Sequence, residues 1–128
     1  MDEQELGQIP LFSDLSEEDL RALSTYADEV TVSEGKHLVD EGGYAYDLFV
    51  IVEGKAQVIV GGDVVAELGP GDFFGEAGVL EKQQRNATVV AKTRMRLVTL
   101  TGWDLRRMRR QLGPVMEKLE QAIEQRSR

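Results

Sequence analysis

Turn-forming residues interrupt the chain every few positions between residues 30 and 100, and this constrains the fold more than any other feature of the sequence. Residues 48–52 form a continuous apolar run rich in β-branched side chains, which is typical of a buried strand. Gly61 and Gly62 separate two short strand-like runs and predict a tight hairpin. Short strands with such frequent turns predict a mainly β fold, a jelly-roll (double-stranded β-helix) barrel over residues 30–100.

Helical patterns flank this region on both sides. Apolar residues at helical spacing precede Pro10, which breaks the pattern, and Ser16 stands before three acidic residues as a helix N-cap does. Near the other end, Pro114 is well placed to begin a final helix. The prediction is a single domain over residues 1–128, with N-terminal helices (1–28), a barrel (30–100) and two C-terminal helices (102–126).

The composition of the chain excludes or disfavours several classes of function. The formal net charge is −8, which disfavours direct binding to nucleic acid or to an anionic membrane. There is no cysteine and His37 is the only histidine, so thiolate chemistry and a histidine-rich metal site are excluded. No apolar run approaches the roughly 20 residues that span a bilayer. We expect a cytoplasmic protein that is not an enzyme, with no metal and no cofactor.

One segment, residues 71–91, carries groups suited to binding a small anionic ligand. Gly75 and Gly78 lie on either side of Glu76 and let the backbone approach a ligand closely, and Arg85 follows nine residues after Glu76. Free backbone N–H groups and a guanidinium can hold a phosphate, whereas a carboxylate can accept from a sugar hydroxyl. These groups together suit a ligand that contains both a phosphate and a ribose.

The same segment resembles a known binding motif. Residues 74–80 (FGEAGVL), four further residues, and then residues 85–89 (RNATV) are similar to the phosphate-binding cassette of cyclic nucleotide-binding domains, without insertion or deletion. That family includes the bacterial catabolite activator proteins and the regulatory subunits of cAMP-dependent protein kinase. The resemblance extends over nearly the whole chain, and the cassette it implies covers residues 74–89.

The resemblance implies a ligand and a set of roles. The ligand would be cAMP, in preference to cGMP, and no residue would be catalytic. Glu76 would accept a hydrogen bond from the ribose 2′-OH, Arg85 would pair with the cyclic phosphate, and Ala87 would pack close to the ligand. The implied ligand-binding residues are Gly75, Glu76, Ala77, Gly78, Val79, Arg85, Asn86 and Ala87.

Two features leave the ligand and the assembly open. Asn86 stands where relatives often carry Ala, Ser or Thr, and its amide can hold the phosphate, favour guanine or do neither. In the final helix, Met116, Leu119 and Ile123 form an apolar stripe that can cap the base, form a homodimer seam, or both. We therefore expect a regulatory sensor that signals by repacking its C-terminal helices, acting on an effector that the sequence does not identify.

Plainer interpretations stand beside these. Glu76 and Arg85 can form a structural salt bridge, in which case the chain is a ligand-free jelly-roll interaction or dimerisation domain. Trp103 is interpreted as a packing anchor. A basic cluster follows it (Arg106, Arg107, Arg109 and Arg110). We interpret that cluster as a solvated helix face, balanced by Glu117, Glu120 and Glu124, rather than as a partner or nucleic-acid patch.

Overall fold

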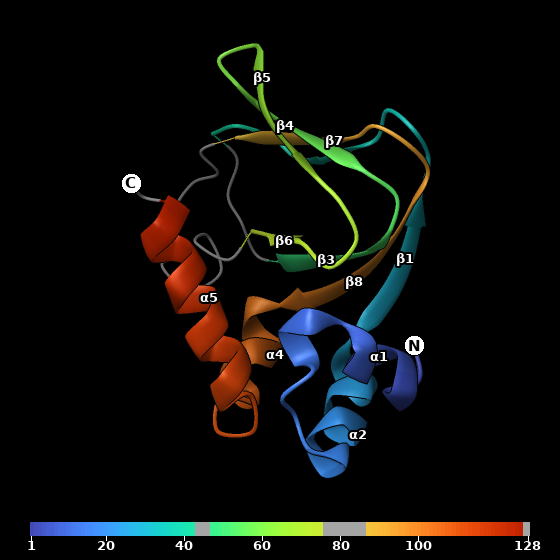
Figure 1. The fold of residues 1–128 in the computed structure, drawn as a ribbon, viewed down its shortest axis with the longest axis vertical. Helices are drawn as coiled ribbons and strands as arrows, with labels where there is room; N and C mark the ends of the chain where they lie inside the picture. Colours follow the sequence, from blue (N-terminus) through green and yellow to red (C-terminus); the bar gives the residue numbers. More distant parts are fainter. Residues whose placement is uncertain (43–46, 76–86, 127–128) are drawn as a thin grey trace.

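The computed structural model describes residues 1–42, 47–75 and 87–126 (Figure 1). The helical elements are α1 (Glu3–Gln8), the 3-10 turn η1 (Pro10–Phe12), α2 (Glu17–Tyr26), α4 (Gly102–Arg107) and α5 (Gly113–Arg126). The strands are β1 (Asp28–Val32), β2 (His37–Val39), β3 (Asp47–Glu53), β4 (Ala56–Val60), β5 (Asp63–Leu68), β6 (Phe73–Phe74), β7 (Thr88–Ala91) and β8 (Met95–Thr101).

Within the described part of the chain, these strands form two four-stranded antiparallel sheets. The first has the order β1-β8-β3-β6 and the second the order β2-β7-β4-β5. Figure 1 shows the helices gathered beside the first sheet, with the β4–β5 hairpin projecting from the second. Neighbouring strands are mostly distant in sequence, as β1 and β8 are, so each sheet joins segments from across the chain.

The two faces of the first sheet support two separate cores. Along β3, Leu48 and Val50 face the helices, whereas Ile51 packs with the second sheet. Along β8, Val98 belongs to the helical core and Leu97 to the core between the sheets. This alternation follows from the two-residue period of a strand, and burial on both faces explains the continuous apolar run at residues 48–52 of β3.

The predicted hairpin at Gly61 and Gly62 is present between β4 and β5. Both glycines have positive φ, 59° and 87°, the combination that a two-residue turn between twisted strands requires. Val60, Val64 and Val65 on this hairpin are exposed. The positive φ angles at the tip therefore favour glycine there.

Hydrogen bonds at their N-termini set where the first helices begin. The Ser16 hydroxyl accepts from the Asp19 N–H at 3.1 Å, which confirms the predicted cap of α2, and Asp2 caps α1 in the same way at 2.8 Å. Leu112, just before α5, and Val115 and Leu119 within α5 face the helical core at the three- and four-residue spacing of an amphipathic helix. No helix in the described ranges is long and apolar enough to cross a membrane.

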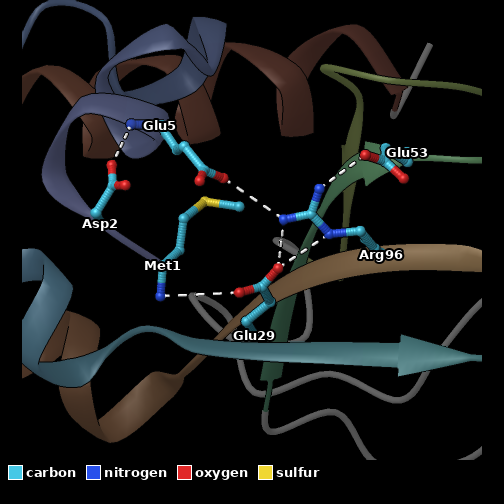
Figure 2. Close-up of polar contacts among 6 residues, drawn as sticks. All are labelled: Met1, Asp2, Glu5, Glu29, Glu53 and Arg96. Atoms are coloured by element: carbon cyan, nitrogen blue, oxygen red, sulfur yellow. Dashed lines mark hydrogen bonds and ion pairs between the residues drawn. The ribbon is translucent and has the colours of Figure 1, made fainter.

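Arg96 ties three elements to β8 on the outer side of the first sheet. Its guanidinium donates to Glu29 of β1 at 3.0 Å and to Glu53 of β3 at 2.7 Å, and it lies 3.5 Å from Glu5 of α1 (Figure 2). The hydrogen bond from Arg96 holds the pKa of Glu29 below its ordinary value, against the opposing effect of desolvation. The same carboxylates raise the pKa of Arg96, so this side chain stays charged.

Candidate nucleotide-binding site

A hydrogen-bonded turn directs the chain into the candidate site. The N–H of Gly71 donates to the Ile51 carbonyl at 2.8 Å, and the Ile51 N–H donates to the Asp72 carbonyl at 2.9 Å. The Asp72 carboxylate accepts from the Gly69 N–H at 2.8 Å, which closes the turn. The segment leading to residue 75 is therefore fixed to the middle of β3.

The strand β6, which follows this turn, contributes one ring of an aromatic pair. Phe74 of β6 stands opposite Phe49 of β3, and their rings stack with centroids 4.9 Å apart and 9° between their planes. Phe74 is buried in the core between the sheets. Gly75 follows with a φ of 93°, a left-handed backbone conformation that glycine adopts without strain. The stacked pair of Phe49 and Phe74 therefore holds the chain at the point where it leaves the first sheet.

The chain re-enters the described region on the other sheet. Ala87 is half-buried, and Thr88 opens β7, which pairs with both β2 and β4. The Thr88 hydroxyl accepts from the Glu41 N–H at 2.9 Å, and the Glu41 carboxylate accepts from the Gly61 N–H at 3.1 Å. The predicted cassette, residues 74–89, therefore begins on one sheet and ends on the opposite one.

The described residues include only the two ends of the predicted ligand-binding set, Gly75 and Ala87. The other members lie outside the described residues: Glu76, Ala77, Gly78, Val79, Arg85 and Asn86. Their roles stay predictions.

The proposed base caps lie on α5. Leu119 is fully buried in the helical core, where η1 also packs, and Met116 is half-buried against the same core. The side chain of Ile123 is not among those described. Capping of a base by these residues stays a prediction, and capping by Leu119 would require this fully buried side chain to change its packing.

Trp103 is a correction to the sequence interpretation. It is 65% exposed and is not a packing anchor. Thr101 caps α4 by accepting from the Asp104 N–H at 3.0 Å, and this start turns Gly102 and Leu105 inward. Residue 103 therefore points away from the core, and the Arg106 guanidinium lies 5.5 Å from the centre of its ring.

His37 and a lysine–glutamate pair on the second sheet are polar groups outside the cassette. His37 begins β2, is exposed, and its Nδ1 lies 2.8 Å from an Asp40 carboxylate oxygen. Among the described residues, no group of three His, Asp or Glu side chains could hold a metal ion. Lys92, directly after β7, binds Glu67 of β5 at 2.8 Å, and that hydrogen bond lowers the pKa of the Glu67 carboxyl.

Sequence reasoning missed a contact that joins the two helical ends of the chain. Lys118 of α5 donates to the Pro10 carbonyl at 2.6 Å and pairs with Asp14 at 3.0 Å. Nothing in the spacing of these residues indicates the contact, because 108 positions separate Pro10 from Lys118. It depends on the tertiary arrangement that brings α5 against η1.

These features define a class: a two-sheet β domain with flanking helices, in which the segment that follows Gly75 connects a strand of one sheet to a strand of the other. The family model described as "Cyclic nucleotide-binding domain" matches residues 29–111. This chain belongs to the cyclic nucleotide-binding domain family, which confirms the resemblance inferred from residues 74–89.

Similarity to an individual relative agrees with this family assignment. The chain is 39% identical over 119 residues to a cAMP-dependent protein kinase regulatory subunit of Yarrowia lipolytica, covering 91% of this chain and 31% of that protein. The chain thus spans about a third of that relative's length.

Solved structures confirm the jelly-roll fold. The regulatory subunit of a cAMP-independent protein kinase A from Trypanosoma brucei superposes with a TM-score of 0.83 at 28% identity, over 93% of this chain and 43% of that one. A Trypanosoma cruzi regulatory subunit of the same description, bound to guanosine, gives a TM-score of 0.80 at 25% identity, over 94% and 44%.

Proposed function

We propose that this domain binds cAMP, in preference to cGMP, in the cassette at residues 74–89, and that binding repacks its C-terminal helices. The observation that carries the proposal is the match of residues 74–80 and 85–89 to the family's cassette, in a chain that belongs to the family. A phosphate held by Arg85 and a ribose hydroxyl held by Glu76 would place the ligand between the two sheets. The domain would act as a binding module that regulates an effector.

The supports on either side of the cassette favour this function. The Phe49–Phe74 stack and the Ile51 hydrogen bonds hold one end of the segment, and the pairing of β7 with β2 and β4 holds the other. A binding segment anchored at both ends loses less conformational entropy when a ligand orders it. The ligand would therefore meet a site whose two ends are already in place.

The preference for cAMP rests on the names of the relatives. The Yarrowia lipolytica relative is described as cAMP-dependent, whereas the Trypanosoma brucei neighbour is described as cAMP-independent and the Trypanosoma cruzi neighbour holds guanosine. Domains with this fold therefore differ in ligand, and Asn86 is the cassette position at which this chain departs from the commoner forms. Guanosine and cGMP belong in every titration beside cAMP.

The proposed signal has a physical route through η1. A Cβ atom placed on Gly71 would lie 3.4 Å from Pro10, so the turn before the cassette packs directly against η1. Lys118 joins Pro10 to α5 on the other side. Movement of the cassette toward a bound phosphate would displace this turn against its hydrogen bonds to Ile51, and would then displace η1 and finally α5. Ligand binding would act by favouring one of two packings of the helices.

The roles are tested by replacing Arg85. Arg85→Ala removes a charge-assisted contact to phosphate worth about 1.5–3 kcal/mol, so we expect cAMP affinity to fall roughly 10- to 150-fold in calorimetry. Arg94→Ala is the matched control, because it removes an exposed arginine from the turn between β7 and β8. This variant should bind cAMP with the affinity of the wild type. Unchanged affinity in Arg85→Ala would overturn the proposed role of this residue.

A further inference from the structure

A basic surface lies on α4 and on the turn that joins it to α5. It consists of one tryptophan and four arginines, all exposed: Trp103, Arg106, Arg107, Arg109 and Arg110. It belongs neither to the cassette nor to the supports of the cassette. Its charge contrasts with the rest of an acidic chain whose formal net charge is −8.

The apolar part of this surface is Trp103. It is the only tryptophan of the chain and is 65% exposed, the largest exposed fraction among the described large apolar side chains. Leaving so much aromatic surface in water forgoes the stabilisation that burial would supply. Tryptophan and arginine are also the residues most enriched at the energetic centres of protein interfaces.

The four arginines have no anionic partner in residues 1–42, 47–75 and 87–126. Among the residues that the structure describes, none of the four makes an ion pair, so the expected balance by Glu117, Glu120 and Glu124 takes no such form. Two of the four lie over aromatic rings instead. The Arg106 guanidinium is 5.5 Å from the Trp103 ring centre, and the Arg107 guanidinium is 5.4 Å from that of Tyr26. Ring contacts of this kind position a guanidinium and leave its N–H groups able to bind carboxylates.

We propose that this basic surface binds a short acidic protein segment that carries an apolar side chain. Glutamate or aspartate carboxylates of the segment bind the arginines, and its apolar side chain covers Trp103. The proposal depends on the charge and exposure of these five residues and stands whether or not the domain binds a nucleotide.

The size and charge of the surface favour an acidic segment over nucleic acid. The four arginines lie within residues 106–110 and can meet only a few phosphates, and fewer phosphate contacts mean weaker electrostatic binding to nucleic acid. The acidic remainder of the chain would also repel an extended polyanion, and this repulsion grows with the length of the polyanion. A short segment meets mainly the local positive field, because salt screens charges beyond about 10 Å.

The test uses Trp103 as its own reporter. The full chain is titrated with a synthetic twelve-residue peptide of alternating glutamates and leucines, and tryptophan emission is recorded. We expect a saturable blue shift as the peptide covers Trp103. Arg109→Glu combined with Arg110→Glu should weaken binding by about tenfold or more, since two charge-assisted contacts become repulsive.

A matched double variant keeps the proposal falsifiable. Lys36→Glu combined with Arg94→Glu makes the same change in net charge, at exposed side chains outside the basic surface, and should bind the peptide almost as the wild type does. Equal losses in both double variants, or no binding at all, would overturn the proposal. Tighter binding of a twelve-nucleotide single strand, or an emission shift that follows protein concentration with a doubling of mass, would overturn it in favour of nucleic acid or of self-association.

Discussion

Lys118 of α5 donates a hydrogen bond of 2.6 Å to the main-chain oxygen of Pro10 in η1. Its ammonium also lies 3.0 Å from the Asp14 carboxylate. Since Pro10 packs against Gly71 in the turn before the cassette, one lysine connects the last helix to the N-terminal segment that supports the candidate site. Any change in the position of η1 must either carry α5 with it or break this contact.

Lys118→Met tests the connection. Methionine keeps most of the apolar length of lysine and removes the ammonium, so both polar contacts are lost. Because Lys118 is partly exposed, we expect the free energy of unfolding to fall by only about 1 kcal/mol. Backbone amides of α5 should exchange faster in hydrogen-exchange measurements. Lys36→Met, at an exposed lysine without an ion pair in the described residues, should leave α5 unchanged; equal protection of α5 in both variants would contradict the connection.

A second prediction concerns the effect of replacing Gly54 on the free energy of unfolding. Its φ is 93°, and an added Cβ would lie 2.4 Å from the carbonyl oxygen of Arg94, so Gly54→Ala introduces both backbone strain and a clash with main chain. Gly35 has a similar φ of 88° with open space around its Cα. We expect Gly35→Ala to cost about 1 kcal/mol and Gly54→Ala roughly 2–4 kcal/mol in chemical denaturation. Equal costs would show that the close approach to Arg94 does not matter.

The contact between Arg96 and Glu29 predicts that the free energy of unfolding depends on pH. The pKa of Glu29 is lower in the folded protein than in the unfolded chain, so its stabilisation is fully present above the unfolded pKa and is lost as the pH falls through the folded pKa. Arg96→Met removes the cause of this shift. The difference in unfolding free energy between wild type and Arg96→Met should therefore shrink below about pH 4.3, where glutamate normally titrates.

Urea unfolding at a series of pH values measures this difference. Arg94→Met, which removes an exposed arginine without an ion pair among the described residues, should differ from the wild type by the same amount at every pH. If the difference in unfolding free energy between the wild type and Arg96→Met is also constant with pH, Arg96 does not lower the pKa of Glu29.

Asn86 predicts an effect on ligand choice. An amide beside the base or phosphate offers both a donor and an acceptor, so Asn86→Ala should change the ratio of cAMP to cGMP affinity if Asn86 contacts the base. Loss of one such hydrogen bond corresponds to about a fivefold change in that ratio. Parallel titrations of both nucleotides measure it. An unaltered ratio would show that Asn86 does not read the base.

The signals that predicted this fold were local. The Gly61–Gly62 turn, the Ser16 cap and the apolar run at residues 48–52 each depend on a few neighbouring residues, and each appears in the structure. The family resemblance then supplied what local rules cannot: the assembly of distant strands such as β1 and β8 into one sheet.

What the sequence could not predict depends on tertiary contacts. Trp103 was interpreted as a packing anchor because large aromatic side chains are usually buried, yet the inward turn of Gly102 and Leu105 places it outside. The stack of Phe49 on Phe74 and the Lys118–Pro10 contact arise only after sheets and helices have assembled. For the candidate site, Gly75 directly follows a strand of one sheet and Ala87 directly precedes a strand of the other, and the roles of Glu76 and Arg85 between them stay predictions.

Calorimetric titration of the full chain, freed of ligand by unfolding and refolding, tests the central claim most directly. With cAMP, the account predicts saturable binding of one nucleotide per chain with a dissociation constant in the micromolar range or below, and weaker binding of cGMP. Binding of guanosine with equal or greater affinity would contradict the assignment to a cyclic nucleotide. The absence of binding to cAMP and cGMP, in a refolded chain that keeps its native circular dichroism, would contradict the proposed function itself.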